Sequence, residues 1–362
     1  MTDSSAPHVH FVYPMFRAPS PALRMRRGAI DTMQRFGFDV SLLGDRTSVR
    51  TESWPARSPF SVTHNVYSRL KERLPVHLYD WQESVSISNQ GCDILLGHPH
   101  LLDQSKVWDR AFRRGGWGLR IAMTPLSHRH AHVSGRLDRF VPGLDAIFGI
   151  MGPYWGDTWQ NSALAHWAPK LTRLDMAIDV QRFPFVKTSF NPPGKRRFLY
   201  IGNDNPDKGL VLLSILFGLA RTSRCTWIGT GRDVPNLEHR SWRPFTAEAV
   251  QLLAEEFDFL ITMGTSDANP TTILEAMAWG LPVCCTPQSG YYRMPEITSM
   301  SINDMNQNVN ILDMLQEAPE TELLTLAKKA RALVERDYTW ERFFERFWAS
   351  LRGVAGQKGI AL

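Results

Sequence analysis

Two acidic residues bracket the start of a predicted helix in the second half of the chain. Asp267 follows an apolar run at residues 257–263, and Glu275 comes eight residues later. We expect Asn269 to be the N-cap of the helix and Pro270 its first residue. The unpaired N–H groups of a helix start suit a phosphate, and ionised carboxylates suit hydroxyl groups. The pattern indicates a nucleotide-sugar site. An ordinary crossover helix with two solvent-exposed acidic residues would show the same sequence pattern.

The residues around these acids predict a β-α-β unit. The run at 257–263 has the length of a buried strand, and Leu274 and Met277 belong to one apolar stripe on the helix. Gly280 and Pro282 end the helix, and residues 283–286 form a second buried strand. We therefore expect parallel strands in a sheet that is covered on both faces.

The full string resembles a known family motif. Asp-x7-Glu followed by Ala-Met-Ala-x-Gly-Leu-Pro-Val is similar to the Glu-x7-Glu motif of the retaining GT-B glycosyltransferases, family 4 in particular. The resemblance is strong over residues 198–350 and weaker before them. It implies an α/β fold of GT-B architecture, with two Rossmann-like domains facing a cleft and a C-terminal helix that crosses back to the first domain.

The resemblance also implies roles for single residues. Asp267 would orient the sugar, Glu275 would hold the ribose, and Lys208 would meet the diphosphate. The donor-binding residues would be Gly202, Asn203, Lys208, Gly229, Gly231, Arg243, Asn269, Pro270, Thr271, Thr272 and Glu275. Among the positions at which the chain departs from the family pattern, Asp267 replaces Glu, Asn203 replaces Arg, and Pro125 replaces His.

In addition to Asp267, two histidines in the first half of the chain are candidates for catalytic contacts. His98 ends a predicted strand at residues 92–98, and His128 follows Pro125. Alternatively, His98 is a structural residue whose hydrogen bonds are satisfied within the fold, and His128 belongs to a cluster of histidines on a surface loop. The spacing His-x-His-x-His that begins at His128 has no acidic or cysteine partner nearby, so we expect no metal site.

The predicted domains are an acceptor domain at 1–186, a linker at 187–197, a donor domain at 198–340 and a crossing helix with its tail at 341–362. The aromatic stripe of the last helix favours core packing over membrane docking. The longest apolar run, residues 210–220, suits a buried helix, and no run approaches the ~20 residues that span a bilayer.

Composition and charge narrow the class of protein. The chain is 43% hydrophobic and 21% charged, and its four cysteines have no metal-ligand spacing, which indicates a globular protein of a reducing compartment. The N-terminus lacks the pattern of a signal peptide. Residues 1–185 carry 22 basic against 16 acidic side chains, whereas the remainder carries 19 against 20.

The basic half could face nucleic acid, an anionic membrane surface or an anionic acceptor. No nucleic-acid-binding motif is present, which disfavours nucleic acid. The surface that faces the acceptor or the membrane would include Phe16, Arg17, Arg24 and Arg27. The alternative is that the arginines form only a solvent-exposed basic face.

The sequence therefore predicts transfer of a sugar from a nucleotide diphosphate sugar to an acceptor hydroxyl. The family resemblance implies retention of configuration and a carbohydrate or lipid-linked acceptor in surface polysaccharide or glycolipid assembly, and we expect no metal and no cofactor. The expected location is cytoplasmic, in part peripheral on the cytoplasmic face of the membrane. An inactive GT-B domain that binds carbohydrate or acts as a scaffold is the main alternative; an epimerase or phosphorylase is another.

Overall fold

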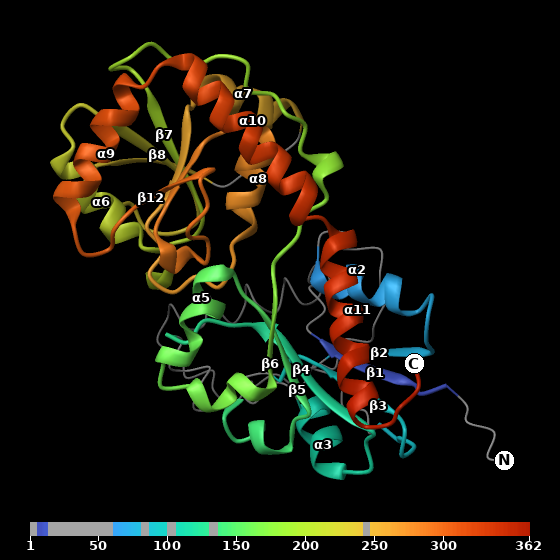
Figure 1. Ribbon diagram of the computed structural model, residues 1–362. Helices are drawn as coiled ribbons and strands as arrows, with labels where there is room; N and C mark the ends of the chain where they lie inside the picture. Colours follow the sequence, from blue (N-terminus) through green and yellow to red (C-terminus); the bar gives the residue numbers. More distant parts are fainter. Residues whose placement is uncertain (1–5, 14–60, 81–86, 100–105, 130–136, 242–246) are drawn as a thin grey trace, which may run out of the picture. The chain divides into compact units, whose positions relative to one another are not determined.

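The computed structural model describes residues 6–13, 61–80, 87–99, 106–129, 137–241 and 247–362 (Figure 1). Within these residues the chain forms two six-stranded sheets with helices. Contacts divide the chain into two units, Met1–Ile121 with Ala355–Leu362, and Ala122–Val354. The end of the chain thus belongs to the same unit as its beginning, while the predicted domain boundaries stay a prediction.

The first sheet has the strand order β2-β1-β3-β4-β5-β6. Its strands are β1 (Val9–Tyr13), β2 (Val76–Asp80), β3 (Ile94–Gly97), β4 (Leu119–Pro125), β5 (Ala146–Ile150) and β6 (Leu171–Leu174). β1 pairs in parallel with β2 and with β3, and β5 pairs in parallel with β6. Every residue of β1, β3 and β5 is buried, which explains why their sequences are apolar except at His10.

Short helices connect these strands. They are α2 (Val62–Leu70), α3 (Lys106–Arg114) and α5 (Pro153–Thr158), with 3-10 turns η2 (Val141–Gly143), η3 (Trp159–Asn161), η4 (Ala165–Lys170) and η5 (Val180–Arg182). Ser61 begins α2 because its side chain accepts a hydrogen bond from the N–H of His64. Pro153 is the first residue of α5, where a missing N–H costs nothing.

The second sheet has the strand order β12-β11-β10-β7-β8-β9. Its strands are β7 (Arg197–Ile201), β8 (Arg224–Gly229), β9 (Leu237–Ser241), β10 (Phe259–Thr262), β11 (Val283–Cys285) and β12 (Ile297–Ser299), all paired in parallel. Side chains of β7 alternate between two apolar clusters, with Phe198 and Tyr200 in one and Leu199 and Ile201 in the other. The sheet is therefore buried on both faces, as the sequence predicts.

The described helices of the second half of the chain follow, of which α11 packs against β5 of the first sheet. They are α6 (Leu210–Leu219), α7 (Ala247–Glu256), α8 (Thr271–Trp279), α9 (Met305–Glu317), α10 (Glu320–Asp337) and α11 (Trp340–Gln357). α8 ends at Gly280, whose φ of +96° is left-handed, and a Cβ there would lie 2.7 Å from the ring of Phe185. None of the described helices is long and apolar enough to cross a membrane.

Residues 210–219 form a helix, as predicted, but the prediction that this helix is buried is wrong for one of its faces. α6 packs only one face on the sheet, and Val211, Ile215 and Leu219 are 65%, 47% and 50% exposed. Its apolar residues surround the helix, so the sequence carries no periodic signal for which face is buried.

The aromatic residues of α11 pack in the core, which confirms that part of the sequence prediction. Phe343 and Phe347 are 2% and 0% exposed, and Phe347 lies edge-on against Phe148 of β5, with ring centroids 5.6 Å apart.

The segment predicted as a linker begins with a buried lysine. Lys187 Nζ donates to the carbonyl oxygens of Ala254 and Phe257 and forms an ion pair of 3.1 Å with Asp258. Asp258 also accepts the N–H groups of Asn191 and Arg197, at 2.9 Å each. These bonds hold the segment against the second sheet, so it is not a freely exposed tether.

Candidate active site

Lys208 and Asp267 meet at the carboxyl ends of β7 and β10. Gly209 makes this approach geometrically feasible: its φ is +71°, and a Cβ at this position would lie 1.9 Å from the carbonyl oxygen of Met263. Only glycine fits such a contact. The Lys208 ammonium forms an ion pair with the Asp267 carboxylate, and their side chains are 30% and 15% exposed. The structure therefore unites a cation and a carboxylate that are 59 residues apart in sequence.

Backbone hydrogen bonds fix the loop that carries Asp267. The carbonyl oxygen of Asp207 accepts the N–H of Thr265 at 2.9 Å. The N–H of Asp267 donates to Gln288 at 3.0 Å, and its carbonyl oxygen accepts the indole N–H of Trp155 at 2.7 Å. The loop is thus anchored on three sides, which positions the carboxylate before any ligand arrives.

Residues 152–155 contribute to the same site within the unit Ala122–Val354. The N–H of Gly152 donates to Ala268 at 2.9 Å, and the N–H of Tyr154 donates to Gly290 at 3.1 Å. A Cβ on Gly152 would lie 2.2 Å from the oxygen of Gly290, so the two backbones touch directly. Nothing in the local sequence marks Tyr154 or Trp155, because their partners Gly290 and Asp267 lie more than 100 residues away.

Asn269 does not cap α8, which corrects the sequence prediction. The N-cap is Pro270, with extended backbone, and α8 begins at Thr271. Asn269 Oδ1 instead accepts the N–H of Met176 at 2.7 Å and the hydroxyl of Tyr291 at 3.2 Å. Asn269 Oδ1 therefore bonds to groups far away in the sequence and not to the first N–H groups of α8. Asn269 Nδ2 is buried without a partner in the described structure, next to the helix start.

The first turn of α8 carries Thr271, Thr272 and, one turn on, Glu275. The initial N–H groups of a helix have no intrahelical acceptor, so this end attracts an anion. Burial raises the pKa of Glu275 from 4.5 to about 7, and a hydrogen bond with Thr271 opposes part of this rise. Near neutral pH, Glu275 therefore exchanges between a hydrogen-bond donor and a pure acceptor.

Glycines line the ends of β7 and β8. A Cβ on Gly229 would lie 1.7 Å from the carbonyl oxygen of Gly202, and Gly231 has a φ of +152° beside Asp204. Gly202 also accepts the indole N–H of Trp227 at 2.7 Å. These strand ends approach so closely that side chains would separate them.

Asn203 is exposed, and its side-chain oxygen accepts the N–H of Asn205 at 3.2 Å. His239, which sequence reasoning missed, stacks on Trp227 with ring centroids 3.9 Å apart and contacts Asp233 at 2.5 Å.

The two candidate histidines lie in different units. His98 follows β3 in the first unit, with its ring edge-on to Tyr13 at 5.4 Å. His128 lies in the second unit, bonded to Thr158 Oγ1 at 2.8 Å and packed against Trp155 at 4.9 Å. Burial, with a smaller effect of Arg129, lowers the pKa of His128, so its ring favours the neutral form.

The remaining predicted residues lie outside the described part of the chain. They are Arg243, Phe16, Arg17, Arg24 and Arg27. Within the described part, no group of three or more His, Cys, Asp and Glu side chains is arranged to hold a metal ion.

Comparison with known proteins shows the fold. No known family matches the chain, and no curated protein does either. The lipopolysaccharide outer core galactosyltransferase WaaB is 14% identical over 96% of this chain and 99% of its own, with a TM-score of 0.56. The N-terminal domain of Candida albicans trehalose-6-phosphate phosphatase is 11% identical over 97% of each chain, with a TM-score of 0.59.

S. aureus TarM, solved as a variant in complex with UDP and α-GlcNAc-glycerol, is 11% identical over 79% of this chain, with a TM-score of 0.53. The chain spans only 58% of TarM. Two parallel six-stranded sheets with helices match the GT-B glycosyltransferase fold of these neighbours, so the predicted fold class is confirmed.

The raised pKa of Glu275 predicts a pH-dependent stability. Between pH 4.5 and about 7 the folded chain keeps this proton while the unfolded chain releases it. The resulting stabilisation is complete below pH 4.5 and is lost as pH rises through about 7. Urea unfolding of wild type and Glu275→Gln should therefore show their stability difference shifting over this interval in favour of the variant. Glu322→Gln, at an exposed position on α10, is the control, and parallel curves for Glu275→Gln and wild type would contradict the shift.

Proposed function

We propose that this protein transfers a glycosyl group from a nucleotide diphosphate sugar to an acceptor hydroxyl. The observation that carries the proposal is the meeting of Lys208, Asp267 and the start of α8 at the carboxyl ends of β7 and β10. Ligands of open parallel α/β sheets bind at this edge. A cation and free helix N–H groups suit a diphosphate, while the adjacent carboxylates suit the hydroxyls of a sugar and a ribose.

Charge stabilisation is the main task of this site. As the bond from the anomeric carbon to the diphosphate oxygen breaks, negative charge grows on the departing diphosphate, and Lys208 and the start of α8 would neutralise it. The acceptor oxygen forms the new bond to the anomeric carbon, and its proton passes to the diphosphate. In this scheme these groups supply the positive charge, which supports metal-independent transfer; retention of configuration follows from the family resemblance.

Asp267 and Glu275 would have separate roles. The ion pair holds Asp267 beside the diphosphate position, from which its second oxygen can accept a sugar hydroxyl. Glu275 lies about one turn into α8, where a ribose would lie, and its ionised form would accept two hydroxyls best. Gly202, Gly229 and Gly231 would admit the nucleotide to the ends of β7 and β8.

The structural neighbours support a uridine diphosphate donor. TarM was solved with UDP and α-GlcNAc-glycerol, and WaaB acts in the lipopolysaccharide outer core. We propose a carbohydrate or lipid-linked acceptor of the same general kind, within surface polysaccharide or glycolipid assembly, at a cytoplasmic location.

Lys208→Ala tests the diphosphate assignment. Loss of a charge-assisted bond should reduce UDP affinity or kcat/KM by about 1.5–3 kcal/mol, roughly ten- to a hundredfold. Calorimetric titration with UDP and turnover of UDP-sugars to free UDP provide the measurements. Lys195→Ala, which removes an exposed loop lysine, is the matched control. Wild-type behaviour of Lys208→Ala in both assays would refute the assignment.

Asp267→Asn separates sugar orientation from diphosphate binding. The variant should lower kcat far more than it changes KM, because orientation matters most in the transition state. UDP itself should bind at least as tightly as to wild type, since Lys208 no longer has a competing carboxylate. If the variant bound UDP more weakly and kept its kcat, Asp267 would serve diphosphate binding and not sugar orientation, which would contradict the assignment.

A membrane association is proposed on charge alone. Residues 1–185 carry the excess of basic side chains, among them Arg17, Arg24 and Arg27, and Phe16 stands beside them in sequence. Each basic residue near an anionic leaflet contributes about 1 kcal/mol, which salt screens. Co-sedimentation with anionic vesicles should therefore fall as salt rises, and binding that ignores lipid charge and salt would contradict the idea.

The inactive-domain alternative makes a different prediction in the same assays. A GT-B domain that has lost catalysis would bind UDP through Lys208 but release no UDP from any UDP-sugar, with or without acceptor.

A further inference from the structure

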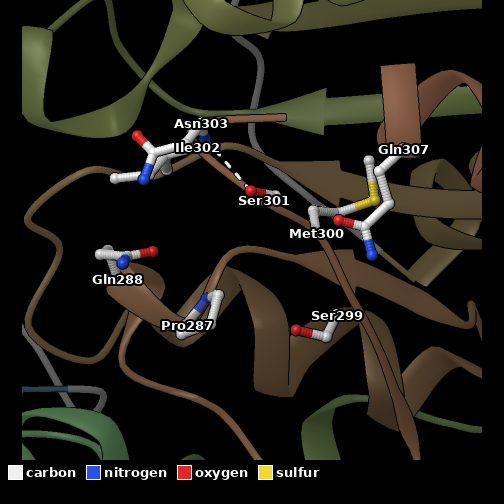
Figure 2. A pocket seen from close by; sticks show the side chains of 8 residues that line it. All are labelled: Pro287, Gln288, Ser299, Met300, Ser301, Ile302, Asn303 and Gln307. Atoms are coloured by element: carbon white, nitrogen blue, oxygen red, sulfur yellow. Dashed lines mark hydrogen bonds between the residues drawn. The ribbon is translucent and has the colours of Figure 1, made fainter. Parts of the chain in front are cut away.

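A small hollow is lined by eight residues of the second half of the chain (Figure 2). Its volume is about 260 Å³. Its walls come from the turn η7 (Pro287–Ser289), from the end of β12 with the loop after it, and from the start of α9. The polar side chains that face it are Gln288, Ser299, Ser301, Asn303 and Gln307. None of its lining residues is charged.

The wall formed by the loop after β12 is already rigid. Ser301 Oγ accepts the N–H of Asn303 at 3.2 Å and that of Asp304 at 3.1 Å. Asn308, which is fully buried, bonds both the N–H and the carbonyl oxygen of Ser301. Asp304 caps α9 by accepting the N–H of Gln307 at 2.8 Å. The loop therefore needs no ligand to take this shape.

Several hydrogen-bonding groups at the hollow are unused. The side chains of Ser299, Asn303 and Gln307 have no hydrogen-bond partner in the described structure. Gln288 Nε2 donates to the hydroxyl of Tyr154 at 3.1 Å, whereas Gln288 Oε1 is buried without a partner. The side chains of Ser299, Asn303 and Gln307 are exposed, so the hydroxyls of a ligand in the hollow can replace the water bound to them.

Gln288 connects this hollow to the proposed active site. Its carbonyl oxygen accepts the N–H of Asp267 at 3.0 Å, while its side chain lines the hollow. A group bound in the hollow would therefore lie next to the loop that orients Asp267.

We propose that this hollow is a subsite for one neutral sugar ring, of the donor or of the acceptor; the identity of the ligand rests on the proposed function. Uncharged amide and hydroxyl groups beside the apolar side chains of Met300 and Pro287 match a ring with hydroxyls on its edge and C–H groups on its faces. A phosphate or carboxylate would find no cation among the lining residues, so it would lose its hydration without compensation. The volume lies below the range of drug-sized sites, which fits a single ring.

The test uses the double substitution Asn303→Leu with Gln307→Leu. Both residues are exposed, so the fold should tolerate the change. Asn306→Leu with Asn310→Leu, on the same helix but outside the hollow, is the matched control. The probes are UDP, UDP-glucose, UDP-galactose and UDP-N-acetylglucosamine by calorimetry, and the methyl glycosides of the three sugars by saturation-transfer NMR.

Each lost neutral hydrogen bond should weaken sugar binding about two- to tenfold. If the ring belongs to the donor, the double variant binds one of the UDP-sugars more weakly and UDP unchanged. If it belongs to the acceptor, the variant loses the saturation signal of a methyl glycoside while UDP-sugar affinity is unchanged. The proposal is overturned if every sugar probe behaves alike in wild type, double variant and control, including the case in which none binds.

Failure of the proposed function can be distinguished from failure of the sugar subsite. It would appear as absence of UDP binding and of UDP-sugar turnover in wild type, and the methyl glycoside measurements would still decide whether the hollow binds a sugar.

Discussion

The site depends on one close approach between two backbone segments. Gly209 touches the carbonyl oxygen of Met263, which brings the loop after β7 against the loop after β10. Because of this contact, the Lys208 ammonium and the Asp267 carboxylate form a partly buried ion pair. Any side chain at position 209 would separate the two loops and therefore the two charges.

Under the proposed function, this ion pair would also govern the free energy of ligand binding. Both side chains are largely removed from water, so each satisfies the other's charge while no ligand is bound. Under the proposed function, a diphosphate would take over part of the hydrogen bonding of the Lys208 ammonium, and sugar hydroxyls would replace the bonds that Asp267 loses. A nucleotide diphosphate sugar would supply both groups at once, so we expect the pair to bind the whole donor better than inorganic phosphate.

Glu275 adds a second constraint. Its burial raises its pKa to about 7, so under the proposed function its ionisation would accompany the binding of ribose hydroxyls near neutral pH. The shift arises from the packing of α8 against the sheet, and the sequence shows no sign of it.

The sequence predicted what local patterns encode. Apolar runs located β10 and β11, and the order of strand, helix and strand around Glu275 indicated a parallel sheet that the structure confirms. Contacts across long stretches of chain were not predictable. Asn269 bonds Met176 and Tyr291 in place of the helix end.

The face of α6 that stays exposed also escaped prediction, because its sequence is apolar all round. Trp155 and Gln288 reach the Asp267 loop for reasons that only the folded chain shows.

A structure of the protein with bound UDP tests the central claim most directly. The account predicts that the β-phosphate lies within hydrogen-bond distance of Lys208 Nζ and of the first N–H groups of α8, with a ribose hydroxyl on the carboxylate of Glu275. UDP bound elsewhere, with Lys208 still paired only to Asp267, would contradict it.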